Sequence, residues 1–133
     1  MAAYLAGQGL PEQRAPGIAG AVMVSGIFDI AAAGTSEMHV AYFGPDSSVW
    51  PARSTLDGLA SAPVPCLFSI SELDPPMFQQ QTAAAVAAIV KAQGRWPAFV
   101  WLRGHNHLSS VLQLGADIDN LGPELRRFID ALP

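Results

Sequence analysis

The sequence predicts an α/β fold built on a parallel sheet. Three apolar runs of strand length, at residues 18–26, 65–70 and 98–103, alternate along the chain with helical patterns. Strands joined through helices need crossover connections, which give parallel pairing. The chain has 133 residues, of which 50% are hydrophobic and 14% charged, a globular composition of one-domain size. We therefore expect a single α/β domain over residues 1–133.

The first strand follows a short helical start. Residues 1–7 are typical of the last turns of a helix that ends at Gly7, and a polar loop rich in Gly and Pro runs from Gln8 to Gly17. The run 18–26 has no polar alternation, which is typical of a parallel strand buried on both faces. Three strands are few for such a sheet. An exposed apolar edge near residues 18–26 would then need another chain or self-association to cover it.

The stretch between the first two strands has no regular pattern. Ser36 suits the N-cap of a short helix over residues 37–42, and residues 44–46 suit a turn. Residues 54–60 form a short helical or turn segment before the second strand. We expect irregular structure through most of this region.

The helix after the second strand has the clearest signals. Asp74 is a good N-cap, Pro75 or Pro76 suits the first helical position, and Gly94 suits the end. Its apolar face recurs at helical spacing and comprises Phe78, Thr82, Val86, Ile89 and Val90. A last helix begins near Pro123 and carries Leu125, Phe128, Ile129 and Leu132 on one side.

The bulk properties exclude several classes of partner. A net charge of −4 with scattered basic residues argues against nucleic acid, which binds clustered Lys and Arg. No apolar run is long enough to suggest a membrane span. The N-terminus lacks a basic, then apolar, leader, so we expect a cytoplasmic location. Cys66, the single cysteine, cannot form an internal disulfide, and its place in an apolar strand predicts a buried side chain.

Polar side chains follow two of the strands where each one ends. Asp74 comes after the strand 65–70, and His105 and His107 come after the strand 98–103. The carboxyl ends of parallel strands meet at one edge of the sheet, where ligands bind. An acid and a histidine there are what a hydrolytic triad needs besides its nucleophile. The alternatives are that Asp74 serves only as a helix cap and that the histidines make local hydrogen bonds in a surface loop.

Other readings of these residues are weaker. Glu72 is a second possible acid, but a solvated turn residue is the simpler interpretation. His105 and His107 lack a third ligand nearby, and His39 is distant, so we expect no metal site. No cofactor motif occurs in the sequence.

The sequence offers no nucleophile. A serine nucleophile needs a sharp strand-to-helix turn flanked by glycines, and no Gly-x-Ser-x-Gly occurs. Ser25 lies at a strand end but lacks a glycine two residues earlier, and Ser36 lacks the second glycine. Cys66 lies inside a strand, away from Asp74.

Three segments together resemble the C-terminal portion of an α/β-hydrolase. They are residues 69–75 (SISELDP), the Ala-rich helix with residues 78–81 (FQQQ), and residues 102–109 (LRGHNHLS). Residues 22–29 (VMVSGIFD) are similar to the strand that follows the nucleophile helix in that superfamily. The nearest members are small carboxylesterases of the feruloyl or acetylxylan esterase and arylformamidase type. By this resemblance residues 31–56 would be a cap or irregular insertion.

The resemblance implies a carboxylic ester hydrolase acting on a small-molecule ester without a cofactor. Asp74 would be the triad acid and His107 the base, with His105 as the fallback. The nucleophile elbow should stand just before a helix like residues 2–6, so the resemblance implies a truncated hydrolase that is inactive by itself. The alternative is a non-catalytic half-domain that acts as a binding or assembly partner.

Overall fold

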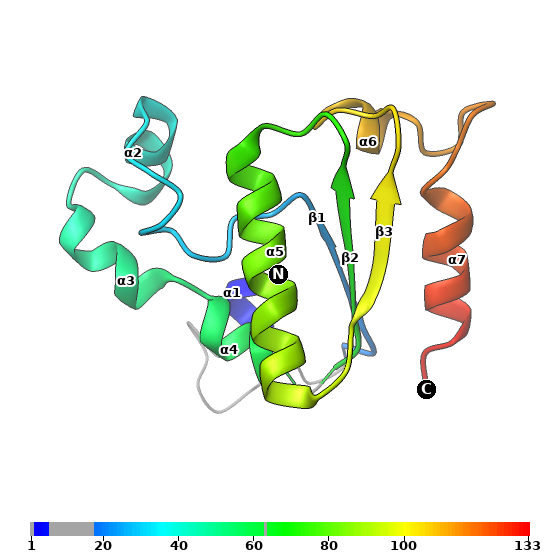
Figure 1. The fold of residues 1–133 in the computed structure, drawn as a ribbon, viewed down its shortest axis with the longest axis horizontal. Coiled ribbons are helices and arrows are strands. Elements are labelled where there is room, and N and C mark those ends of the chain that lie inside the picture. Colours follow the sequence, from blue (N-terminus) through cyan, green and yellow to red (C-terminus); the bar gives the residue numbers. More distant parts are fainter. Residues whose placement is uncertain (1, 6–17, 63) are drawn as a thin grey trace.

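The chain folds around a three-stranded parallel sheet with helices on both sides (Figure 1). The computed structural model describes residues 2–5, 18–62 and 64–133. Its strands are β1 (Ala21–Val24), β2 (Cys66–Ser71) and β3 (Ala98–Leu102), in the spatial order β1-β2-β3. The predicted α/β class with a parallel sheet is confirmed.

β2 is the centre of the sheet. All six of its residues are buried, because β1 and β3 pair with it on either side and helices cover its faces. The register places Val24 of β1 beside Ser69, and Ser71 beside Leu102 of β3. The carboxyl ends of the three strands therefore meet at one edge.

The two outer strands are less buried than β2. β1 is shorter than the run 18–26, and only alternate residues, Ala21 and Met23, are fully buried. On β3, Phe99 and Trp101 are 40% and 52% exposed, because α5 packs mainly against β2 and leaves an open groove beside β3. The strongly exposed apolar residues of the described sheet thus lie on β3, while β1, within residues 18–26, is the other outer strand.

The long helix α5 (Pro76–Gln93) matches the prediction except at its cap. Gly94 ends it in the left-handed conformation, as expected. Asp74 is not its N-cap: the cap residue is Pro75, and no side chain caps the first turn. The carboxylate of Asp74 instead bonds to the Ser71 amide before it and to two side chains distant in the sequence. The face turned to the sheet carries Gln81, Thr82, Ala85, Val86 and Ile89.

Shorter helices make up most of the remainder. The region 31–56 contains α2 (Glu37–Phe43), a 3-10 turn η1 (Ser47–Val49) and α3 (Trp50–Arg53). Ser36 caps α2 by accepting from the amide of His39, as predicted. The predicted segments near 2–6, 54–60 and 123–132 appear as α1 (Ala2–Leu5), α4 (Leu56–Ala60) and α7 (Gly122–Asp130), whereas α3 and α6 (Ser109–Leu112) were not predicted. The expected stop at Gly7 and the loop 8–17 lie outside the described residues.

The core fills the space between β1, β2, α4 and α5. Phe28 and Phe68 meet edge to face at 5.7 Å near its centre, both almost completely buried. Cys66 lies in the same cluster and is buried, as predicted. α7 covers the opposite side of the sheet (Figure 1), where Phe128 and Leu132 pack on Gly20. Within the described residues no helix combines the length and apolarity that a membrane span requires.

Candidate active site

Three polar side chains from three strand ends meet at the carboxyl edge of the sheet. Ser25 follows β1, Asp74 follows β2 through a tight turn, and His107 follows β3. The turn after β2 is closed by the Asp74 amide, which donates to the carbonyl of Ser71. The parallel register brings together groups that are 33 and 49 residues apart in the sequence.

Asp74 and His107 form a hydrogen-bonded pair. The Nδ1 atom of His107 lies 2.9 Å from Oδ1 of Asp74. The Asp74 side chain is fully buried, whereas that of His107 is 41% exposed. No described residue hydrogen-bonds to the second ring nitrogen of His107, Nε2. The imidazole is thus held at one nitrogen by a buried carboxylate and leaves the other nitrogen available.

The second carboxylate oxygen of Asp74 is also occupied. Oδ2 accepts a 2.7 Å hydrogen bond from the hydroxyl of Ser25 and another of 2.7 Å from the amide of Ser71. A buried carboxylate is tolerated when such donors compensate for the lost water. Three groups therefore fix Asp74 in position.

Ser25 sits in an unusual backbone conformation. It is the one non-glycine with positive φ in the described chain, at 43°, and it is buried. Strain of this kind is often found at functional sites. However, the carboxylate lies between Ser25 and His107, so His107 does not contact the Ser25 hydroxyl directly. The arrangement makes Ser25 a support for Asp74 and not a nucleophile activated by the histidine.

Phe78 holds the other side of the His107 ring. Its ring stacks on the imidazole at a centroid distance of 4.1 Å and an interplanar angle of 25°. Phe78 was predicted to be part of the apolar face of this helix, and the structure places it in the first turn, where it contacts the histidine loop. The imidazole is therefore fixed both by its edge, through Asp74, and by its face, through Phe78.

His105 and Glu72 lie near the pair but make other contacts. The ring nitrogens of His105 lie 3.3 Å from the Ser109 hydroxyl and 3.2 Å from the Asn120 amide nitrogen. Glu72 accepts from the backbone amide of Gly104 at 2.7 Å, which ties the two strand-end loops together. The structure thus brings His107, and not His105, against Asp74.

Gln81 was missed by sequence reasoning and organises the loop beyond Ser25. Its side-chain oxygen accepts from the amides of Phe28 and Asp29, at 2.9 and 2.8 Å, and its nitrogen donates to the carbonyl of Asp29. The residue is buried on α5. A glutamine at a buried position of an otherwise apolar helix face is the signal that could have indicated these hydrogen bonds.

His39, the third histidine, is remote from this edge. It is buried on α2, with Nδ1 2.7 Å from the Ser36 hydroxyl. Across the described residues no three His, Cys, Asp or Glu side chains gather closely enough to hold a metal ion.

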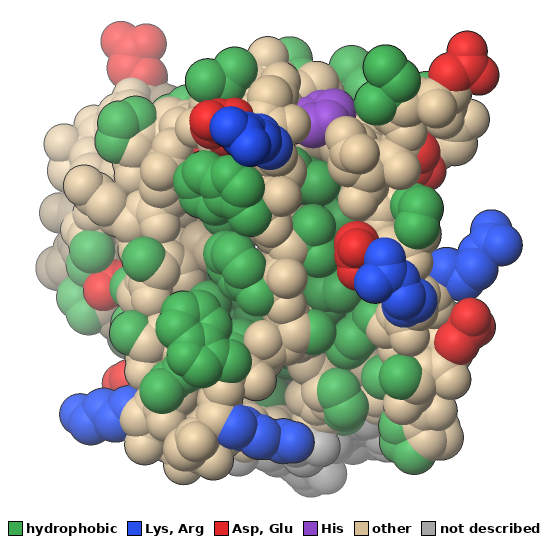
Figure 2. Space-filling view, turned by 45° about the vertical axis from the view of Figure 1, so that its right-hand side comes forward, with side chains coloured by type: hydrophobic (Ala, Val, Ile, Leu, Met, Phe, Trp, Pro, Cys, Tyr) green, Lys and Arg blue, Asp and Glu red, His purple; other side chains and the backbone are tan. Residues whose placement is uncertain are grey.

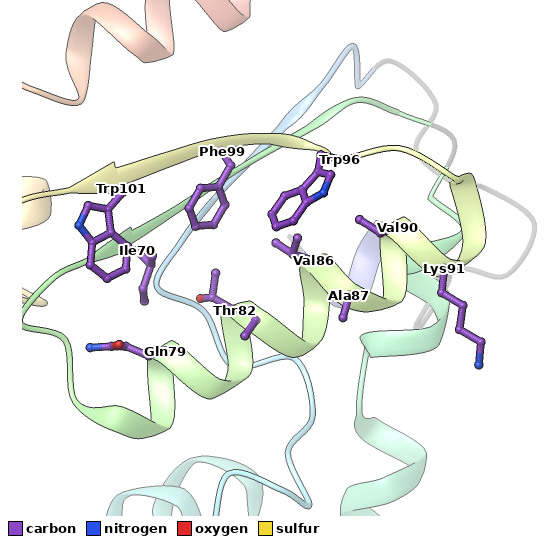
Figure 3. Close-up of a pocket in the computed structure, with 11 residues that line it drawn as sticks. Ile70, Gln79, Thr82, Val86, Ala87, Val90, Lys91, Trp96, Phe99 and Trp101 are labelled. Carbon is purple, nitrogen blue, oxygen red and sulfur yellow. The ribbon is translucent and has the colours of Figure 1, made fainter.

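A large apolar groove lies between α5 and β3, away from the Asp74–His107 pair (Figure 3). It measures about 730 Å³, with Trp96, Phe99 and Trp101 on its strand side and Thr82 and Val86 on its helix side. Figure 2 shows hydrophobic side chains spread down this face, with a histidine near its upper end. Neither Asp74 nor His107 lines the groove.

Comparison with known proteins gives structural matches but no sequence matches. No protein-family model matches the sequence, and no curated protein matches it. Among solved structures, the fold resembles carboxyl esterase 2 from the mycorrhizal fungus Tuber melanosporum, with a TM-score of 0.67 and 18% sequence identity. The match covers 99% of this chain but 50% of that one, so this chain spans about half the length of the esterase. The chain thus shares its fold with about half of that esterase.

Proposed function

We propose that this chain carries the acid and the base of a carboxylic ester hydrolase, with Asp74 as acid and His107 as base. The observation that carries the proposal is the 2.9 Å contact between a fully buried carboxylate and a half-exposed imidazole. The likeness in fold to a carboxyl esterase supports the same reaction class. The stacking of Phe78 adds to this support, because it holds the imidazole plane.

In this mechanism Nε2 of His107 takes the proton from a serine hydroxyl as its oxygen attacks the carbonyl carbon of the ester. Asp74 accepts from Nδ1, which keeps the tautomer with Nε2 unprotonated and then stabilises the imidazolium. The imidazolium returns the proton to the departing alcohol as the carbon–oxygen bond breaks. Water then attacks the acyl-serine, with His107 taking the proton from water and returning it to the serine oxygen as the acid departs.

The nucleophilic serine in this proposal comes from outside the 133 residues. They contain no Gly-x-Ser-x-Gly, and Ser25 is separated from His107 by the carboxylate of Asp74. The chain also spans half of the esterase that it resembles. By itself it should hydrolyse p-nitrophenyl acetate no faster than its His107→Ala variant does.

The test is to read and express the coding sequence directly upstream of Met1 together with the chain. We expect a Gly-x-Ser-x-Gly a few codons before Met1 and hydrolysis of p-nitrophenyl acetate by the longer protein. His107→Ala and Asp74→Ala should each lower kcat by about a thousandfold or more. The control His105→Ala should stay within about threefold. An upstream frame without the elbow, or turnover that survives His107→Ala, would refute the proposal.

A second candidate function is assembly through the outer edge of β3. In the described sheet this edge is unpaired and lies beside the exposed side chains of Trp96, Phe99 and Trp101, which are 70%, 40% and 52% exposed. Edge strands of this kind promote pairing with another chain. Sedimentation would test it: association that Trp101→Lys weakens favours this function, and a monomer at high concentration contradicts it.

A further inference from the structure

A second cavity, of about 590 Å³, lies on the other flank of α5 from the groove of Figure 3. It is open to solvent and is lined by α1, α2, the loop after β1 and the first turn of α5. Its walls are mostly aliphatic and aromatic and include Ile27, Ile30 and Met38. The volume is within the range of sites that hold small molecules.

Phe78 connects this cavity to the base of the proposed pair. The side chain lines the cavity and also stacks on the imidazole of His107 at 4.1 Å. A group that fills the cavity would therefore be separated from the imidazole of His107 by the ring of Phe78. The larger groove between α5 and β3 includes neither Phe78 nor His107.

The charge of the lining favours an uncharged occupant. Among the described lining residues only Arg53 carries a fixed charge, and its Nη1 donates at 2.7 Å to the carbonyl of Phe43. His39 also lines the cavity, but its Nε2 is sealed from solvent. Met38 and Tyr42, at 77% and 83% exposure, border the cavity and add apolar surface to its rim.

We propose that this cavity is the subsite for an uncharged, apolar substituent of the ester, and that Phe78 is a positioning residue shared by subsite and base. An occupant packs against the Phe78 ring, and the ring in turn sets the plane of the imidazole. Filling the subsite thereby orders His107 with Nδ1 on Asp74 and Nε2 toward the substrate. This inference rests on the proposed function for its identification of the occupant as an ester.

The test is an NMR titration of the 133-residue chain with methyl benzoate, a neutral ester, and with benzoate, its charged counterpart. Methyl-labelled methionine reports occupancy through Met38, and the ring protons of His107 report its orientation. Methyl benzoate should shift both sets of signals with one dissociation constant. Benzoate should bind at least about fivefold more weakly, because its charge would lose hydration against apolar walls.

Variants of Phe78 separate positioning from simple packing. In Phe78→Leu the Met38 shift should persist with affinity within about threefold, while the His107 shift on binding is lost. Phe78→Tyr keeps the flat ring and should restore the His107 shift. Phe78→Met replaces Phe78→Leu if that variant unfolds.

Three results would overturn the inference. They are equal binding of benzoate, shifts confined to the indole signals of Trp96 and Trp101, and a His107 response that survives without an aromatic ring at position 78. The measurement requires no turnover, so it stands apart from the hydrolysis test. If methyl benzoate does not bind but hydrolysis still depends on His107, only the subsite is refuted. If methyl benzoate binds as expected but hydrolysis does not depend on His107, only the proposed function is refuted.

Discussion

Ser25 gives the sharpest test of how the site is held together. Its hydroxyl donates a buried 2.7 Å hydrogen bond to Oδ2 of Asp74, while its backbone φ of 43° is unfavourable for a residue with a side chain. Replacing Ser25 by Ala removes the bond and keeps the strain. Replacing it by Gly removes both. The two variants therefore separate the two effects.

The magnitudes follow from each term. A hydrogen bond to a charged group contributes about 1.5–3 kcal/mol, so Ser25→Ala should lower the free energy of unfolding by about 2 kcal/mol. Glycine relieves left-handed strain of about 1–2 kcal/mol but loses about 0.5–1 kcal/mol through its greater freedom in the unfolded chain. Ser25→Gly should therefore cost about 1 kcal/mol, and the glycine variant should be the more stable of the two.

The assay is urea unfolding at neutral pH, with a constant m value as the sign that only stability has changed. Ser110→Ala is the matched control, because the Ser110 hydroxyl also donates at 2.7 Å but to the uncharged carbonyl of His107. It should cost about 1 kcal/mol, as neutral hydrogen bonds do. Equal costs for Ser25→Ala and Ser25→Gly would refute the assignment of strain. A cost for Ser25→Ala no greater than that of the control would refute the charge-assisted bond.

Three further predictions concern the supports of the site and its surroundings. Gln81→Leu should lower the free energy of unfolding by about 3 kcal/mol in urea, because it leaves the amides of Phe28 and Asp29 unpaired, whereas the exposed neighbour Gln80→Leu should change little. Burial raises the pKa of the Cys66 thiol to about 11, so iodoacetamide at pH 8 should modify it about 100-fold more slowly than free cysteine. Because the folded protein disfavours the thiolate, the contribution of Cys66 to the free energy of unfolding should fall above pH 9. Rapid modification of the folded protein would contradict this. Hydrogen bonds from the amides of Gly115, Gly122 and Leu121 lower the pKa of Asp119, so its contribution to stability is present above about pH 4 and is lost as the pH falls; the difference in urea midpoint between the wild type and Asp119→Asn should shrink below pH 4.

The sequence predicted the parallel sheet because its signals are local. Apolar runs mark the strands, and Gly94 ends α5 by a conformation that glycine adopts most readily. The positions of Asp74 and His107 at strand ends follow from the same reading, since parallel strands place those ends at one edge. That the two side chains meet is a property of the register, which pairs Ser71 with Leu102.

The errors arose where distant contacts outweighed local preference. Asp74 has the sequence context of a helix cap, but Ser25 and His107 compete for its carboxylate and the helix starts without a side-chain cap. The apolar runs of β2 and β3 look alike in sequence, yet Trp101 is exposed because β3 is an outer strand of the described sheet, whereas β2 is its centre. Neither the order of strands nor the backbone angle of Ser25 has a signature in a single sequence.

The contacts of Asp74 limit what this carboxylate can do. Both oxygens are engaged, Oδ2 by Ser25 and Ser71 and Oδ1 by His107, and the side chain has no contact with solvent. Such a carboxylate has no oxygen left with which to attack a substrate or bind a metal ion. What remains is to accept from Nδ1 and hold the imidazole, whose Nε2 is the one site atom of the pair that no described residue engages. The asymmetry between a sealed acid and an accessible base therefore favours proton transfer at His107 over any reaction at Asp74 itself.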